Sequence, residues 1–367
     1  MKKTHLFVAI VILAFMGTQC ASTNANSPDR DSFELALVSD GSTIETNAFI
    51  RGIWEGITRF GSEKRAPHKF YLPAQQNEQA LLAVIDEAVN GGAKIIVAPG
   101  YNFKTPVYIA QDKYPDVKFL LVDSVPRSQT AAGQPDTYHT GANTASILYA
   151  EDQAGFLAGY AAVRDGYRQL GFMGGMAVPT VIRYGYGFIQ GAEYAAKELK
   201  LAPGSVTVKY HYTGDFIASR KTQNMASSWY SGGAEVIFAC GGAVGSSVMI
   251  AAEQAGKKVI GVDIDQSGES SAVISSAMKG LRHSVYTCMD ALYSRRFPGG
   301  QNLVFSASNN GVGLSMTTSR FNTFSNADYD AIFKKLSDGS IPRITHLENK
   351  GKPDLVPVSI LKIEEIL

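Results

Sequence analysis

Short apolar runs alternate with longer stretches of helical spacing along most of the chain. Apolar runs of this length are typical of strands buried on both faces of a parallel sheet. They predict strands at residues 33–39, 69–72, 93–98, 118–123, 146–149, 168–172, 206–212, 234–239, 259–262, 272–275 and 302–306. The stretches between them predict helices at residues 47–60, 76–90, 105–112, 151–164, 180–199, 217–230, 244–255, 278–296 and 326–336, before a last strand-like segment at 356–363. This alternation predicts an α/β fold with mostly parallel sheets covered on both faces.

A polar, turn-rich segment at residues 124–143 separates two similar halves of this pattern. The length of 367 residues is sufficient for two domains. Two α/β halves are the outline of a bilobed binding protein, but a two-domain Rossmann enzyme has the same periodicity. The pattern alone leaves both interpretations open.

The N-terminus is typical of an exported protein. Lys2 and Lys3 precede an apolar stretch at residues 6–16, which is too short to span a bilayer, and Cys20 is followed by a polar segment. This order predicts a signal peptide at residues 1–20, lipidation of Cys20 and a flexible tether at residues 21–32. Because Gln19 stands where a bacterial lipobox has a small residue, cleavage by an ordinary signal peptidase is the alternative.

Composition and missing motifs exclude several classes of function. The formal net charge of +1 gives no electrostatic reason to expect binding to nucleic acid. The turn after the first strand contains Gly41-Ser42 rather than GxGxxG, and no GxSxG occurs, so the fingerprints of a dinucleotide site and a hydrolase elbow are missing. The scattered histidines lack metal-ligand spacing, and Cys240 and Cys288 are either free thiols or a disulfide. We therefore expect no cofactor, no metal and no enzyme activity.

Carboxylates recur where predicted strands end, at Asp40, Asp123, Asp263 and Asp265. Acids in such positions are commonly turn formers or helix caps. In open α/β sheets, however, ligands bind beyond the carboxyl ends of the strands, and one carboxylate can accept hydrogen bonds from both hydroxyls of a diol. These acids are therefore candidates for binding a hydroxylated ligand.

Two glycines also follow a predicted strand, at Gly241 and Gly242. They lack the Lys-Ser/Thr that completes a phosphate-binding loop. They either present backbone amides to a polar ligand or form only a tight turn.

A series of short motifs extends from about residue 33 to the end of the chain. In order, they are Asp40 with Trp54-Glu55-Gly56, Asp123-Ser124, Glu151 with Gln153 and Gly155-Phe156-Leu157-Ala158-Gly159, Gly174-Gly175-Met176, Val262-Asp263-Ile264-Asp265-Gln266, Met278-Lys279, and Asn310-Gly311-Val312-Gly313-Leu314. Each is weak alone, but in number and order they resemble the basic membrane protein (BMP) family of substrate-binding lipoproteins.

The resemblance implies a type I periplasmic-binding-protein fold, with two Rossmann-like lobes joined by a three-segment hinge. It places the crossovers near Ile147 and near residues 266–271 and 306–310. The N-terminal lobe would comprise residues 33–147 and 272–307, and the C-terminal lobe residues 148–271 and 308–367. The implied protein is a monomer, lipid-anchored at the cell membrane and facing the periplasm or exterior. It captures purine nucleosides for an ABC permease and its ATPase.

The resemblance also implies roles for individual residues. Phe49 matches the aromatic that stacks on the base, although it could instead pack in the core, and Tyr184 is the second aromatic. Asp263 matches the acid that binds the ribose hydroxyls, with Lys279 and Asp123 as further polar contacts.

Base recognition is where the chain departs from the family pattern. Glu45 and Thr46 replace two acids, and Ile50 replaces an asparagine. Asn47 can supply an amide instead, while Asp40 either reaches the base or caps the following turn. The same fold binding a sugar or signalling metabolite, a nucleoside-cleaving enzyme, and a sensor docked to a membrane kinase remain alternatives.

Overall fold

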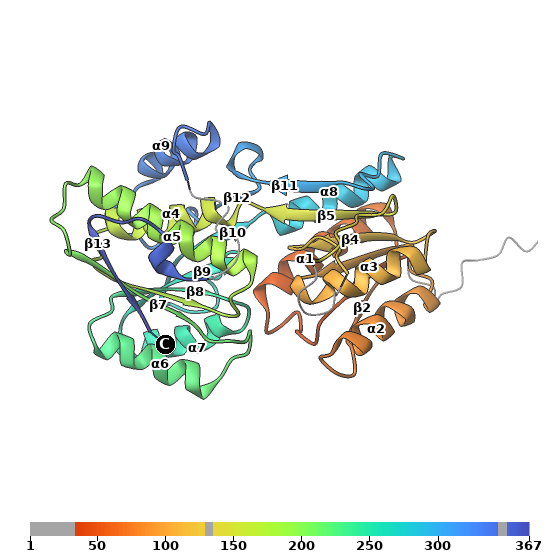
Figure 1. Ribbon diagram of the computed structural model, residues 1–367, viewed down its shortest axis with the longest axis horizontal. Coiled ribbons are helices and arrows are strands. Elements are labelled where there is room, and N and C mark those ends of the chain that lie inside the picture. Colours follow the sequence, from red (N-terminus) through yellow and green to blue (C-terminus); the bar gives the residue numbers. More distant parts are fainter. Residues whose placement is uncertain (1–33, 129–134, 344–350, 367) are drawn as a thin grey trace, which may run out of the picture.

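The computed structural model describes residues 34–128, 135–343 and 351–366. Figure 1 shows two α/β lobes lying side by side, each built around one sheet with helices on both faces. The predicted signal peptide, Cys20 and tether lie outside the described residues.

The N-terminal lobe contains a six-stranded parallel sheet. Its strands are β1 (Leu35–Val38), β2 (His68–Tyr71), β3 (Ile95–Pro99), β4 (Lys118–Val122), β5 (Thr144–Tyr149) and β11 (Asn302–Phe305), in the order β11-β5-β4-β3-β1-β2. Its helices are α1 (Ala48–Lys64), α2 (Glu78–Asn90), α3 (Lys104–Lys113) and α8 (Leu281–Tyr293). Leu35 and Leu37 pack on the side of α1 and α8, whereas Ala36 and Val38 pack on the side of α2 and α3, so β1 is buried on both faces as predicted.

The C-terminal lobe contains a seven-stranded sheet. Its strands are β6 (Gln169–Gly174), β7 (Val206–Tyr212), β8 (Val236–Cys240), β9 (Lys258–Asp263), β10 (Val273–Lys279), β12 (Val312–Leu314) and β13 (Leu361–Glu365), in the order β12-β10-β9-β8-β6-β7-β13. Its helices are α4 (Glu151–Arg164), α5 (Pro179–Glu198), α6 (Arg220–Ser231), α7 (Val244–Ala255) and α9 (Asn326–Ser337). Only the pairing of β12 with β10 is antiparallel among the described strands.

Within the described residues, the chain crosses between the lobes in three places. The first crossing follows β5, at Ala150, and the third lies between β11 and β12, close to the predicted positions. The second corrects the prediction. β10 pairs with β9 in the C-terminal sheet, so the chain returns to the N-terminal lobe after Lys279 and not at residues 266–271.

The same correction applies to the helix predicted at residues 278–296. Met278 and Lys279 complete β10, and α8 begins at Leu281. The sequence obscured this because β10 contains two buried serines, which resemble the end of an apolar run. Both are satisfied inside the lobe: Ser275 Oγ donates to the carbonyl oxygen of Ser315 at 3.2 Å, and Ser276 Oγ accepts from the backbone N–H of Gln266 at 3.0 Å.

Helices α4 and α5 approach each other closely through glycines. A Cβ on Gly159 would overlap the carbonyl oxygen of Phe188, and one on Gly191 would overlap that of Phe156. This contact places the first turn of α4, which begins at the first crossover, directly against α5. It thereby fixes Glu151, the first residue of α4, next to the first crossover.

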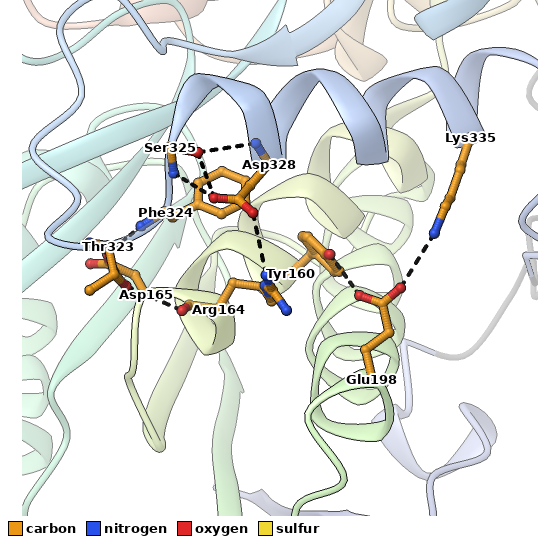
Figure 2. Close-up of polar contacts among 9 residues, drawn as sticks. All are labelled: Tyr160, Arg164, Asp165, Glu198, Thr323, Phe324, Ser325, Asp328 and Lys335. Atoms are coloured by element: carbon orange, nitrogen blue, oxygen red, sulfur yellow. Dashed lines mark hydrogen bonds and ion pairs between the residues drawn. The ribbon is translucent and has the colours of Figure 1, made fainter.

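Helix α9 is attached to α4 and to the end of α5 by polar contacts (Figure 2). Arg164 and Asp328 form an ion pair at 3.3 Å, and Lys335 pairs with Glu198 at 3.4 Å. Asp165 accepts hydrogen bonds from the backbone N–H groups of the segment before α9, at 2.6 Å from Thr323 and 3.0 Å from Phe324. These bonds hold the segment after the third crossover on the C-terminal lobe.

The last strand, β13, completes the C-terminal sheet beside β7. It begins later than the predicted segment at 356–363. The buried carboxylate of Glu193 on α5 accepts from the N–H and hydroxyl of Ser359, both at 2.7 Å, and from the N–H of Leu361 at 3.0 Å. One acid of α5 thus anchors the C-terminal strand.

Candidate functional site

All nine residues predicted to contact a ligand line one cavity between the lobes. They are Asp40, Asn47, Phe49 and Asp123 from the N-terminal lobe, and Tyr184, Gly241, Gly242, Asp263 and Lys279 from the C-terminal lobe. The cavity encloses about 710 Å³ not occupied by atoms, part of it open to solvent. It lies beyond the carboxyl ends of the strands in both sheets, as expected for an α/β fold.

Lys279 is the centre of a buried charge cluster in this cavity. Its side chain is 2 % exposed and forms an ion pair with Asp123. Its Nζ also lies 3.6 Å from a carboxylate oxygen of Glu151 and 3.6 Å from one of Asp263. Arg183 donates to the other oxygen of Glu151 at 2.6 Å. Three acids therefore face two bases at the point where both lobes and two crossovers meet.

Asp123 and Asp263 occupy equivalent positions in the two lobes. Asp123 directly follows β4, Asp263 is the last residue of β9, and each has a positive φ, 65° and 70°. This left-handed conformation is uncommon outside glycine, although aspartate tolerates it better than most residues. Such residues cluster at functional sites, where the surrounding structure holds them in place. Here the turn brings both carboxylates toward Lys279.

Burial changes the protonation of this cluster. It raises the pKa of Asp123 to about 7, because desolvation outweighs the attraction of Lys279. Burial likewise raises the pKa of Asp263. For Lys279, burial would lower the pKa, but the carboxylates of Asp123, Asp263 and Glu151 outweigh it and raise the pKa above its usual value. Lys279 is therefore positively charged, and the three carboxylates share this one ammonium group.

Two carboxylate oxygens in the cluster are buried without a hydrogen-bond partner among the described residues: Oδ1 of Asp123 and Oε1 of Glu151. A buried acceptor without a donor costs about 1–3 kcal/mol, and more when it is charged. The cluster is therefore suited to a ligand that brings hydrogen-bond donors.

Aromatic rings surround the ammonium group of Lys279. Its Nζ lies 5.2 Å from the ring centroid of Phe49 and 5.3 Å from that of Tyr184. Tyr184 is 2 % exposed, packs edge-on against Phe238 and donates from its hydroxyl to the carbonyl oxygen of Ala277 at 3.3 Å. It is therefore a fixed part of the cavity wall, whereas Phe49 is only partly buried.

The start of α1 positions Phe49. Asn47 is the N-cap, and its Oδ1 accepts from the N–H groups of Phe49 at 3.0 Å and Ile50 at 3.2 Å. The side-chain oxygen of Asn47 therefore caps the helix and is not available to a ligand. Its side-chain nitrogen, Nδ2, faces the opposite lobe. A Cβ on Gly242 would lie 3.1 Å from that nitrogen.

The two glycines after β8 permit close approach. A Cβ on Gly241 would overlap the backbone of Gly175, and Gly242 has a φ of 53°. The tight-turn interpretation therefore holds for both, and both also line the cavity.

Asp40 lies at the other end of the cavity. Its Oδ2 accepts from the side-chain amide of Asn102 at 3.1 Å, and its Oδ1 accepts from the N–H of Ser42 at 3.3 Å. It therefore both caps its own turn and lines the cavity.

Asp265 and Gln266 lie outside the cavity, in the connection from β9 to β10. Asp265 accepts from the N–H of Ser267 at 2.9 Å, and Gln266 Oε1 accepts from the N–H of Val262 at 2.8 Å. They stabilise a turn within the C-terminal lobe and not the predicted crossover.

Sequence reasoning missed several residues of the site, among them Tyr101, which follows β3 and lines the cavity. Phe216, in the loop after β7, and Asn102, after β3, both line the cavity, and Glu151 contacts Lys279. Glu151 lies two residues after the predicted strand at 146–149, so the rule that identified the aspartates could have found it. Phe216 directly follows the polar Thr213-Gly214-Asp215 segment and gave no comparable signal.

Within the described residues, no group of three or more His, Cys, Asp or Glu side chains is arranged to hold a metal ion. Cys240 and Cys288 are both buried free thiols. No helix in the described part of the chain has the length and apolarity needed to cross a membrane.

Solved structures with this architecture confirm the expected type I periplasmic-binding-protein fold. An ABC transporter solute-binding protein from Aeropyrum pernix superposes with a TM-score of 0.72 at 20% identity, covering 86% of this chain and 94% of that one. A second, from Conexibacter woesei, has a TM-score of 0.65 at 20% identity and covers 86% and 99% of the two chains.

Sequence relatives extend the comparison to family level. The chain is 26% identical to the ABC transporter nucleoside-binding protein BmpA of Lactococcus lactis over 342 residues, covering 86% of this chain and 92% of the relative. It is 24% identical over 285 residues to basic membrane protein B of Borreliella burgdorferi, covering 76% and 79%. Residues 33–350 match the model of the Bmp family, described as PnrA-like substrate-binding proteins of ABC transporters. The predicted resemblance is thus confirmed, and the chain belongs to this family.

Proposed function

We propose that this chain captures a nucleoside in the cavity between its lobes and delivers it to an ABC permease. Family membership implies a ligand, with a permease and an ATPase in the membrane as partners. The choice of a nucleoside is supported by the name of the Lactococcus lactis relative. The single observation that carries it is a cavity with aromatic side chains from both lobes and a buried carboxylate–lysine cluster.

The cluster is the proposed site for the ribose. Asp263 and Asp123 both face Lys279, and Asp123 has a buried oxygen without a donor among the described residues. The vicinal hydroxyls of a ribose supply donors to these carboxylates, and Lys279 donates to a hydroxyl oxygen. Bonds to charged groups contribute about 1.5–3 kcal/mol each.

The aromatic residues form the proposed site for the base. Phe49 approaches from α1 of the N-terminal lobe and Phe216 from the loop after β7 of the C-terminal lobe. Stacking contributes about 1–3 kcal/mol per base in nucleic-acid complexes. In this arrangement Tyr184 forms the wall between base and sugar instead of the second stacking face. Asn47 and Asp40 contact the base edge, and Gly241 and Gly242 let the base enter closely.

We infer that the protein binds its ligand without chemical change. The family is one of solute-binding proteins. The acids at the sugar end form ion pairs with Lys279, an arrangement suited to binding the hydroxyls of a ligand. Closure of the two lobes around the ligand would present the loaded form to the permease.

The proposed location is the outer face of the cell membrane. The order of a basic n-region, an apolar stretch and Cys20 supports export and a lipid anchor, with residues 21–32 as the tether. We propose that the protein works there as a monomer. Mass spectrometry of the membrane-extracted protein tests the anchor, since lipidation adds acyl chains to Cys20.

Calorimetry with inosine, hypoxanthine and ribose tests the ligand. Inosine should bind and raise the melting temperature, because ligand at 100 times its Kd adds about 2.7 kcal/mol of stability. Asp263→Asn should weaken inosine binding by at least about tenfold, since it removes the charge but keeps a residue that tolerates positive φ. Asp112→Ala, on the exposed surface of α3, is the control.

Binding of ribose as tightly as inosine would replace the nucleoside by a sugar. Release of free hypoxanthine during incubation with inosine would show an enzyme. Equal inosine affinities of wild type and Asp263→Asn would remove Asp263 from the site.

A further inference from the structure

The end of the cavity away from Lys279 has its own supporting network. β4, β3 and β1 are consecutive neighbours in the N-terminal sheet, and Asp123, Tyr101 and Asp40 follow them in that order. Adjacent strands are about 4.8 Å apart. Tyr101 and Asp40 therefore lie one and two strand spacings beyond the acid at the proposed sugar site.

Arg127 holds Tyr101 from outside the cavity. Its guanidinium donates to the Tyr101 hydroxyl, and its central carbon lies 5.0 Å from the centroid of that ring. The same guanidinium pairs with Asp136 at 2.8 Å and donates to the hydroxyl of Tyr138 at 3.2 Å. Tyr101 lines the cavity, whereas Arg127 is not among the described residues that do so.

A second cation fixes the same ring. Nζ of Lys104 lies 4.0 Å from the centroid of Tyr101, and the backbone N–H of Arg127 donates to the carbonyl oxygen of Lys104 at 3.2 Å. Cations in such contacts attract the ring face by about 0.5–1 kcal/mol at exposed sites and more when desolvated. The orientation of Tyr101 is thus determined by two basic residues and not by the sheet alone.

The restraint continues to Asp40. Tyr101 begins a short 3₁₀ turn, Tyr101–Phe103, whose second residue donates to Asp40 at 3.1 Å. The preceding Gly100 has a φ of 93°, so the turn leaves β3 sharply, and a Cβ there would lie 4.0 Å from Cε1 of Phe49. Arg127 is therefore connected through one turn to both the polar and the aromatic groups at this end.

We propose that Arg127 is a positioning residue that determines base selectivity by holding Tyr101 and, through Asn102, Asp40. This rests on the proposed nucleoside function. A purine extends one ring further from its ribose than a pyrimidine, so it reaches the end that Tyr101 forms. Arginine suits this role because its planar guanidinium group can donate to the hydroxyls of Tyr101 and Tyr138 and to the carboxylate of Asp136 at the same time.

Calorimetry with inosine and uridine tests this proposal, because the two ligands share the same ribose. In Arg127→Gln, the ratio of inosine to uridine affinity should fall by about tenfold, the effect of 1.4 kcal/mol at the base end. Tyr101→Phe removes only the hydroxyl and should lower the ratio in the same direction. In the Tyr101→Phe background, Arg127→Gln should change the ratio of inosine to uridine affinity less than it does in the wild-type background, as expected for coupled residues.

Arg59→Gln is the control, because Arg59 is an exposed arginine that pairs with Glu63 on α1. It should leave the ratio unchanged. A residue with a purely structural role would instead lower the melting temperature or weaken both ligands by the same factor. An unchanged ratio in both Arg127→Gln and Tyr101→Phe would overturn this inference alone. A wild-type protein that binds neither ligand would overturn the proposed function as well.

Discussion

Replacement of Lys279 by methionine removes the charge at the centre of the buried cluster with little change in side-chain length. In the wild type, its ammonium group lies within ion-pair distance of Asp123, Glu151 and Asp263. After the substitution, Arg183 still pairs with Glu151, but Asp123 and Asp263 lose their basic partner. We expect a protein that folds with reduced stability.

The magnitude follows from the burial of the group. Removing one partner of a buried ion pair costs about 3–5 kcal/mol, because the remaining charge is left uncompensated. The acids can avoid this cost by binding protons. Asp123 already has a pKa raised to about 7 by burial, and loss of Lys279 raises it further. An acid whose pKa is higher in the folded protein than in the unfolded chain does not destabilise the folded protein at low pH. The destabilisation begins as the pH rises above the pKa of the unfolded chain, and it is complete above the pKa of the folded protein. The deficit of Lys279→Met should therefore be small near pH 4 and largest above pH 7.

Urea unfolding of wild type and variant between pH 4 and pH 9, without ligand, measures this deficit. Lys362→Met is the control, because Lys362 is exposed and forms a surface ion pair with Glu364. Exposed pairs contribute about 0–1 kcal/mol, so its unfolding should scarcely change. A deficit for Lys279→Met below about 1 kcal/mol at pH 8, or one independent of pH, would refute the reasoning.

Two further predictions concern separate parts of the molecule. Phe49→Ala should weaken inosine binding by at least about tenfold while leaving the unfolding midpoint nearly unchanged, since stacking contributes about 1–3 kcal/mol; a normal Kd by calorimetry would make Phe49 a packing residue. Burial would raise the pKa of Glu193, but hydrogen bonds from Ser359 and Leu361 outweigh it and hold that pKa at about 2. Glu193→Gln should therefore lower stability by about 1–3 kcal/mol at pH 7, and the difference from wild type should disappear as the pH falls from about 4.3 toward 2. Thermal unfolding across this range measures it, with the exposed Glu365→Gln as control, and a constant difference would contradict the role given to Glu193.

The strands and helices were largely predictable because most buried segments have unbroken apolar runs. β9 and α7 show this: the strand lies between β8 and β10, and the helix has the predicted bounds. The strand predicted at residues 272–275 is the first half of β10, but its end and its lobe were predicted wrongly because Ser275 and Ser276 interrupt the apolar pattern. Their polarity is compatible with burial only because Ser315 and Gln266 supply partners, and these lie far along the chain or across a turn.

The candidate site was predictable where one strand end carries its own acid. Asp40, Asp123 and Asp263 follow this rule, and the cavity contains all three. Phe216 and Asn102 escaped notice because nothing in their own segments marks them. They belong to the site only because folding brings their loops beside loops that follow other strands.

The sequence by itself determined the α/β class, the two halves, the family and the nine residues that meet in the cavity, because alternating apolar runs and local motifs are properties of contiguous segments. Only the tertiary structure decided where β10 belongs, which acids share Lys279, and how Arg127 reaches Tyr101. These depend on distances between segments far apart in the chain, and on the burial that makes a charge costly. Asp123 illustrates the division: its position at a strand end is local, whereas its pKa and its partner arise from residues up to 156 positions away.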